Sequence, residues 1–255
     1  MGSPVSDYRE WLPPPEWRNA VLCQWEQRVT GGRYVQRVLP DGCADIIVDP
    51  DGRAIVAGPA IHVLLPHLEP GTLRGLRLRS EAIGPVFGLA GSELFGITVA
   101  IDAVIPARRA RAAVRVLMAD DDSGAWWAHA VIDPRVGAAC AALRHARGSV
   151  AEVADNVGLS SRQLRRLLLA ATGQGPKTLQ RVGRLQRFVA LADQVAPPWR
   201  LAELAAVAGY ADQAHLCREV RDLAGATPVD LLRERRPTAQ HLLGAAVTSG
   251  EEGWD

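Results

Sequence analysis

The chain is 255 residues long, with 48% hydrophobic and 22% charged residues, which suits a soluble globular protein of two ordinary domains. No run approaches the roughly 18 uncharged apolar residues of a membrane-spanning helix, so the composition excludes such a helix and predicts no membrane partner. The formal net charge of +1 hides an asymmetry, because residues 1–130 carry −2 and residues 131–255 carry +3.

The first residues and the cysteines indicate the cellular compartment. Met1 to Pro4 lack the basic and apolar segments of a signal peptide, which predicts a cytoplasmic protein. In a reducing compartment, cysteines without C-x-x-C spacing are expected to be thiols rather than disulfides. The four cysteines are Cys23, Cys43, Cys140 and Cys217.

The N-terminal half has the patterns of a β-rich domain. Residues 35–39 and 73–79 show alternation or β-type runs. Two apolar runs, at 44–48 and 54–57, flank the sequence Asp-Pro-Asp-Gly at 49–52. Apolar runs on either side of such a turn predict a β-hairpin.

The boundary between the two halves follows a predicted helix. Residues 106–118 have apolar side chains at helical spacing, and the acidic patch at 120–124 has the composition of a connecting segment. We therefore expect a β-rich domain over 1–125 for effector sensing or dimerisation, with a linker over 126–132. Helical patterns follow from Asp133 onward.

Tryptophan is unusually frequent in the first half of the chain. Some of the indoles are expected to fill the core, and one or two to line a pocket for a small, largely apolar effector. The candidate pocket residues are Trp11, Trp25 and Cys43.

Two histidines and a glutamate near a predicted strand suggest a metal site as an alternative. His62, His67 and Glu69 have the spacing H-x4-H-x-E, and Pro66 interrupts it. This spacing is not diagnostic of a metal site. We predict neither a metal nor a cofactor, and keep these three residues as the alternative.

The second half contains one structural unit twice. Val150 to Gly158 aligns with Leu201 to Gly209 at an offset of 51 residues, which becomes 52 after the turn. With the later offset Leu164 matches Leu216, Gly173 matches Gly225, and Pro176 matches Pro228. A repeat of this kind marks two copies of one supersecondary unit.

The first copy has the pattern of two short helices joined by a glycine turn. A capping box starts each helix, Ser149 with Glu152 and Ser160 with Gln163, and Gly158 separates the helices. The outer face of the second helix carries Arg162, Arg165 and Arg166. This pattern predicts a helix-turn-helix, against the alternative of a helical bundle with solvated arginines.

The second copy repeats this design. Gly209 ends its first helix, and Asp212 caps the second. A long helix over 177–192 joins the copies and would let both second helices enter adjacent major grooves, roughly 34 Å apart. The outward side chains of the last helix are Gln213, Cys217, Arg218 and Arg221.

A run of cations without acids spans the first copy and the connecting helix. Between Asp155 and Asp193 the chain holds Arg162, Arg165, Arg166, Lys177, Arg181, Arg184 and Arg187, and no acidic residue. A solvated helix face usually has acids interspersed, so this run favours a polyanion partner. Lys177, Arg181 and Arg184 therefore join the candidate DNA contacts.

The stretch from Gly209 to Arg233 resembles the signature of the AraC/XylS family of transcription regulators. It has, in the order of the family, Gly-aromatic, Asp-Gln-x-His, x-x-Arg and Gly-x-Thr-Pro. The likeness extends back to about Val150, and departs at Val220, where the family commonly has Phe. The resemblance implies a double helix-turn-helix over 133–238, followed by a tail over 239–255.

The resemblance also assigns the side chains that read DNA. They are Arg162, Arg165 and Arg166 in the first copy, and Gln213, Ala214, Cys217 and Arg218 in the second. Gln163 and Arg221 lie on the same helices and complete the candidate set. Arg pairs with guanine and Gln with adenine, whereas Ala and Cys are poor base readers, so the first copy is expected to carry more of the specificity.

Segments of the first half are similar to a sensor-type domain that precedes this DNA-binding module in many actinobacterial members of the family. They lie at 37–48, 57–59, 68–71 and 75–79. This resemblance implies an architecture and no particular effector.

Together these patterns predict an α+β protein, in which a β-rich domain precedes an all-α domain of two helix-turn-helix units joined by a long helix. The expected function is transcription regulation, not catalysis. The expected partners are double-stranded DNA, a small-molecule effector and RNA polymerase, and the chain would act as a monomer or homodimer. Two alternatives are a metal-binding β-domain enzyme or sensor fused to a helical module, and a scaffold whose first domain only dimerises.

Overall fold

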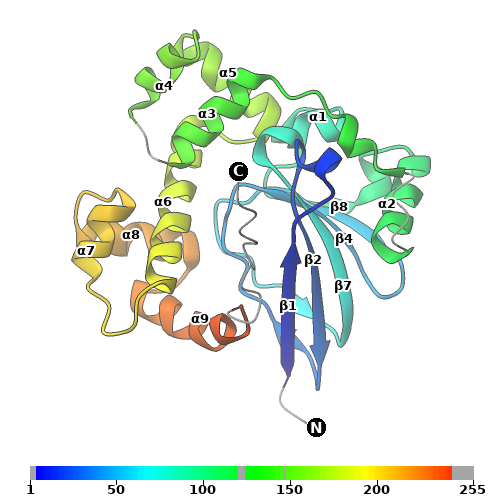
Figure 1. Ribbon diagram of the computed structural model, residues 1–255, viewed down its shortest axis with the longest axis horizontal. Coiled ribbons are helices and arrows are strands. Elements are labelled where there is room, and N and C mark those ends of the chain that lie inside the picture. The colour runs from blue at the N-terminus through cyan, green and yellow to red at the C-terminus, as the bar shows by residue number, and fades with distance from the viewer. Residues whose placement is uncertain (1–3, 120–123, 146–147, 243–255) are drawn as a thin grey trace, which may run out of the picture.

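The computed structural model describes residues 4–119, 124–145 and 148–242. Strands dominate the N-terminal part and helices the C-terminal part, and Figure 1 shows the two parts side by side. The predicted α+β class is therefore confirmed. Among the described residues, no helix is both long enough and apolar enough to span a membrane.

Within the described ranges, six strands form the main sheet, in the order β1-β2-β7-β4-β5-β8, and every neighbouring pair is antiparallel. Two short strands, β3 and β6, pair separately. The bounds are β1 Val5–Trp11, β2 Val21–Thr30, β3 Tyr34–Val35, β4 Ala44–Val48, β5 Ala54–Ala57, β6 His67–Leu68, β7 Gly71–Leu78 and β8 Thr98–Ala100. The predicted hairpin is confirmed, because β4 and β5 pair as antiparallel neighbours. In the turn between them, Asp49 Oδ1 accepts hydrogen bonds from the amides of Asp51 and Arg53.

The predicted β-type run at 35–39 is mostly wrong as a strand. Only Tyr34–Val35 pairs as a strand, and an isolated bridge joins Val38 to Leu64. The segment leaves the sheet because it contacts the helical part of the molecule. Arg37 forms an ion pair with Glu234 there, and Leu39 packs against a helical core.

Helix α2 (Ala107–Ala119) covers one face of the main sheet and confirms the predicted helix at 106–118. The first hydrophobic core lies between them and includes Ile46, Val56, Leu76, Val116 and Leu117. Trp127 belongs to the same core, where its ring meets Trp17 edge to face at 5.4 Å. The segment from 126 to 129, expected in the linker, is thus a 3-10 helix packed into the first domain.

Short helices complete the first domain, and three of them, η2, α1 and η3, contact α5 of the helical part. They are η1 Pro15–Trp17, η2 Ser80–Ala82, α1 Ile83–Phe87, η3 Gly91–Glu93, η4 Ile101–Ala103 and η6 Trp126–His129.

Two helix-turn-helix units make up the C-terminal part. The helices are α3 Pro134–Arg144, α4 Val150–Asn156, α5 Ser161–Thr172, α6 Pro176–Asp193, α7 Leu201–Ala208, α8 Gln213–Ala224 and α9 Pro228–Leu242. Helix α6 joins the units and contributes Leu179 to the core of the first and Phe188 to that of the second. The sequence repeat is visible in α5 and α8, which both span 12 residues and end at a left-handed glycine, Gly173 and Gly225.

Candidate nucleic-acid interface

The second helix of the first unit, α5, presents a cationic outer face. Arg162, Arg165 and Arg166 are exposed, whereas Leu164 and Leu168 on the opposite face are fully buried. Among the described residues, none of these three guanidinium groups has an acidic partner. The outer face of α5 therefore keeps its full charge for an external anion.

A capping box sets the start of α5. Ser160 Oγ accepts a hydrogen bond from the amide of Gln163 at 3.3 Å, and Gln163 Oε1 accepts one from the amide of Ser160 at 2.9 Å. This confirms the predicted box. The cap uses the side-chain oxygen Oε1 of Gln163 and leaves the side-chain NH2 group free of it. This NH2 group is the one that would donate a hydrogen bond to a base.

The outer face of α8 in the second unit is less cationic. Gln213, Arg218 and Arg221 are exposed there, and Cys217 is half-buried. Within the ranges that the structure describes, neither arginine has an acidic partner. A thiol is a weak hydrogen-bonding group, so Cys217 adds little hydrogen-bonding capacity to this face.

His215 supports the start of α8. Its amide donates a hydrogen bond to Asp212 Oδ1 at 2.6 Å, which makes Asp212 the predicted N-cap. Its ring packs edge to face on Tyr210 at 5.3 Å, and Nδ1 accepts a hydrogen bond from the amide of Ala211. The side chain of His215 is therefore engaged in the turn before the helix.

A buried carboxylate on α8 neutralises two of the predicted DNA contacts. Glu219 is 5% exposed and lies 2.9 Å from Arg181 Nε and 2.8 Å from Arg184 Nη2. Nε2 of His215 is 3.4 Å away on the same helix. Arg181 also pairs with Asp222, and its hydrogen bond lowers the pKa of that carboxyl group. These ion pairs join α6 to α8.

Sequence reasoning missed this role of Glu219. The acid-free interval ends at Asp193, so counting charges inside it stops before the neutralising residue. The available signal was the position of Glu219, directly before the buried Val220 on an amphipathic helix.

The other two cations on α6 differ from each other. Lys177 is exposed in the first turn and, among the described residues, has no acidic partner. Arg187 donates hydrogen bonds to the carbonyl oxygens of Ala208 at 3.2 Å and Arg144 at 3.1 Å. Arg187 thus ties the two units together, while Lys177 is a further exposed cation at the start of α6.

Two family models match separate parts of the chain. Residues 153–234 match one described as a helix-turn-helix domain, and residues 9–100 match a domain of unknown function (DUF6597). The chain carries an AraC-type helix-turn-helix domain. The AraC-type domain contains both units, and this confirms the resemblance inferred from the signature at 209–233. Such domains belong to DNA-binding transcription regulators.

Solved structures of AraC-type regulators are among those similar to the chain. One, a transcriptional regulator from Chromobacterium violaceum, has 24% sequence identity, covers 40% of this chain and 92% of its own, and gives a TM-score of 0.36. ToxT from Vibrio cholerae has 10% identity, covers 79% of this chain and 96% of its own, and gives 0.41. A ToxT structure with a bound unsaturated fatty acid has 9% identity, covers 91% and 95%, and gives 0.40. The comparison with curated proteins gave no match.

The three candidate pocket residues do not lie together. Trp11 and Trp25 line one small cavity of about 200 Å³, with Arg74 and Met118 at its rim. Cys43 is not among the lining residues, because it is buried in the loop before β4 that faces the AraC-type domain. Burial raises the pKa of the Cys43 thiol well above its ordinary value.

A larger cavity lies on the other side of α2. Its volume is about 620 Å³, and it is lined by Trp17 and Trp126 together with Arg108, Arg109 and His129. Glu16 also lines this cavity, so aromatic surface is combined with arginines and a carboxylate, a lining that suits a ligand with an apolar body and a polar or charged group.

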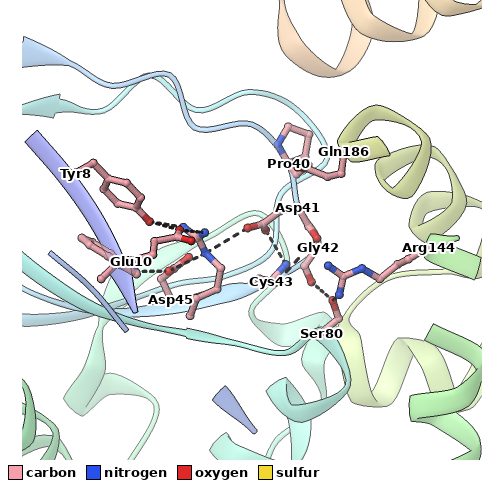
Figure 2. Close-up of polar contacts among 12 residues, drawn as sticks. Tyr8, Glu10, Pro40, Asp41, Gly42, Cys43, Asp45, Ser80, Arg144 and Gln186 are labelled. Carbon is pink, nitrogen blue, oxygen red and sulfur yellow. Dashed lines mark hydrogen bonds and ion pairs between the residues drawn. The ribbon is translucent and has the colours of Figure 1, made fainter. Parts of the chain in front are cut away.

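A polar cluster around Arg77 lies on the sheet face opposite α2, and Figure 2 shows its members. Arg77 is 2.9 Å from Glu10, 3.3 Å from Asp41 and 3.4 Å from Asp45. Tyr8 donates a hydrogen bond to Glu10 at 2.6 Å. Burial raises the pKa of Asp45 to about 6, although the neighbouring Arg77 opposes this shift. One cation is therefore shared by three carboxylates.

The alternative metal ligands are engaged separately. His62 Nδ1 lies 2.8 Å from the carbonyl oxygen of Asp222 in the AraC-type domain, and Glu69 pairs with Arg33 at 2.6 Å. His67 is exposed on β6. In the part of the chain that the structure describes, no group of three or more His, Cys, Asp or Glu side chains could hold a metal ion.

Proposed function

We propose that the protein is a sequence-specific DNA-binding transcription regulator. The observation that carries the proposal is a set of exposed cations on both units that have no acidic partner among the described residues. They are Arg162, Arg165, Arg166, Lys177, Arg218 and Arg221. Neutralising DNA phosphates with such groups releases condensed counterions, which drives binding at low salt.

The cations have different roles in this proposal. Side chains on the exposed faces of α5 and α8 read base edges, because the second helix of such a unit enters the major groove. The base-reading set is Arg162, Gln163, Arg165, Arg166, Gln213, Cys217 and Arg218. Lys177 and Arg221 contact phosphates. Arg181 and Arg184 position α8 instead, since Glu219 and Asp222 together already match their charge.

The test is selection of bound sequences from random duplexes by the full chain. We expect a consensus of two half-sites, one for each unit, because both recognition helices carry base-reading groups. The log–log dependence of affinity on salt is expected to have a slope of about −0.9 for each phosphate neutralised. Recovery of no enriched sequence, or an affinity that does not change with salt, would overturn the proposal.

We also propose that a small molecule bound in the first domain controls DNA binding. The cavity beside α2 and η6 has a volume of about 620 Å³, within the range of small-molecule sites. Helix η6 lies close before α3 in the chain, so a ligand there lies next to the entry to the AraC-type domain. A ligand exerts control only if it binds the DNA-competent and incompetent states unequally. Contacts with RNA polymerase and a homodimeric state stay predictions of the family resemblance.

Tryptophan fluorescence and thermal shift of the full chain test this proposal. The compounds are small apolar molecules with and without a carboxylate, and selected DNA is then added. A ligand must change DNA affinity by the same factor by which DNA changes ligand affinity. Trp126→Phe and Trp11→Phe distinguish the two cavities, and we expect only Trp126→Phe to alter the response. Ligands that bind without changing DNA affinity would contradict effector control.

A further inference from the structure

The C-terminal end of α8 is held by the first domain. The last carbonyl groups of a helix have no partner within the helix. At 222–224 three successive carbonyls accept hydrogen bonds, at 2.8, 2.7 and 2.7 Å in chain order, from His62 Nδ1, the amide of Val63 and Nη1 of Arg37. A guanidinium group at this end also suits the helix dipole. The first domain therefore caps the second recognition helix.

The C-terminal end of α5 rests on the same domain, through α1 and η3. A Cβ atom on Gly91 would lie 2.5 Å from the amide nitrogen of Gly173. One on Gly84 would lie 2.5 Å from the carbonyl oxygen of Ala170. Side-chain atoms do not fit at such distances, so the two backbones are in direct contact only because glycine stands at these positions.

Between these two contacts, the loop 40–43 joins the first domain to the residues around α6. The carbonyl oxygen of Gly42 accepts a hydrogen bond at 2.9 Å from Nε2 of Gln174, which is 1% exposed. The carbonyl oxygen of Pro40 accepts one at 2.7 Å from Gln186 on α6, as Figure 2 shows. Buried polar groups of this kind fix orientation, because they lose their partners if the surfaces slide.

Both recognition helices, α5 and α8, thus place their C-terminal ends on the first domain and expose residues nearer their N-termini, including Arg162, Arg165 and Gln213. We propose that the first domain is a brace that fixes the separation and orientation of α5 and α8, and so selects the spacing between the two DNA half-sites. This proposal rests on the proposed function, because a preferred spacing between half-sites exists only for a protein that binds DNA through both units. Without the brace, α6 would be the main link between the units.

The test uses the full chain and duplexes in which the spacer between the selected half-sites is lengthened or shortened by up to about four base pairs. Arg37→Ala removes one of the three hydrogen bonds that cap α8 together with the ion pair to Glu234, and Gly91→Ala opposes the contact with α5. Arg33→Ala is the matched control, since its ion pair with Glu69 is exposed and lies within the first domain.

For the wild type and Arg33→Ala, a change of two base pairs is expected to lower affinity at least roughly tenfold, because a displaced α8 loses base contacts. For Arg37→Ala and Gly91→Ala the dependence is expected to flatten to within about threefold, with unchanged affinity for the first half-site alone.

Each other outcome has a definite consequence. Failure of the wild type to select any DNA overturns the proposed function, and the brace with it. The brace proposal alone is overturned if the wild type has no spacing preference. It is also overturned if the Arg37→Ala and Gly91→Ala variants keep the spacing preference of the wild type. Thermal unfolding of every variant is measured first. If Arg37→Ala is unfolded, Arg37→Gln replaces it, and a spacing dependence equal to that of the wild type contradicts the proposal.

Discussion

The two helix-turn-helix units share one backbone design and use charge differently. In the first unit the arginines of α5 are exposed and, among the described residues, have no acidic partner. In the second unit Glu219 lies buried on α8 and binds two arginines of α6. The first unit therefore offers its charge to an external anion, while the second uses much of the nearby charge to fix its own position.

This difference shows that a cationic helix is not by itself a binding surface. Arg165 and Arg184 belong to the same acid-free interval, yet only Arg165 is exposed, while Arg184 is 18% exposed and faces Glu219. A charge that is already matched inside the protein releases few counterions when DNA binds.

Removing Glu219 is expected to have the largest effect. Glu219→Ala leaves Arg181 and Arg184 without their shared counter-charge at half-buried positions. The free energy of unfolding should fall by about 3 kcal/mol, the lower end for a broken buried ion pair, because Arg181 retains some solvent access. Urea unfolding of the full chain measures it.

Glu203→Ala is the control for this change. Its ion pair with Arg200 is exposed on both sides, and its loss should cost less than about 0.5 kcal/mol. If the two variants were equally stable, the ion pairs of Glu219 would be as dispensable as a surface pair, and the second unit would not differ from the first.

Arg165→Ala is expected to change base preference. Losing one direct base contact should lower discrimination by roughly 1–3 kcal/mol at one or two base pairs. Arg184→Ala should instead lower stability and leave base preference unchanged, because its guanidinium faces Glu219. Competition binding with single-base variants of the selected site measures both. An equal loss on all sequences for Arg165→Ala would make it a phosphate contact.

Sequence patterns predicted the features that depend on near neighbours. The capping boxes at Ser149 and Ser160 and the glycines after the first helix of each unit, Gly158 and Gly209, involve residues a few positions apart, so their spacing identifies them. The exposed arginines of α5 followed from helical periodicity in the same way.

The contacts that the sequence did not predict join distant positions. Arg181 and Glu219 are 38 positions apart, and Arg37 and Ala224 are 187 apart. Helical spacing places a side chain on a face but does not say what packs against that face. For the same reason the sequence predicts one pocket for Trp25 and Cys43, although Cys43 does not line the cavity that Trp25 lines.

Salt dependence should separate the exposed from the paired cations. Lys177→Ala and Arg221→Ala should each reduce the magnitude of the log–log slope by about 0.9, the contribution of one phosphate contact. Arg181→Ala should leave the slope unchanged, because Glu219 and Asp222 already match its charge. Binding isotherms on one duplex over roughly 50–300 mM salt give the slopes. A lower slope for Arg181→Ala would show that it contacts a phosphate in the complex.

The smallest expected effect is on the pH dependence of stability, and it comes from Asp222 in the second unit. The hydrogen bond from Arg181 lowers the pKa of Asp222 below its ordinary value of 3.8. A carboxyl group with a lowered pKa stabilises the folded state above its unfolded pKa, and this contribution disappears as the pH falls through the folded pKa. Asp222→Asn should therefore be less stable than the wild type above about pH 4, and the difference should vanish in more acidic solution. The difference should be a few tenths of a kcal/mol, because the side chain of Asp222 is 50% exposed and solvent screens the pair.

Urea unfolding at several pH values measures this difference, with Glu203→Gln as the control. A stability difference that stays constant to low pH would mean that Asp222 acts through packing or hydrogen bonding that asparagine does not reproduce, and not through its charge.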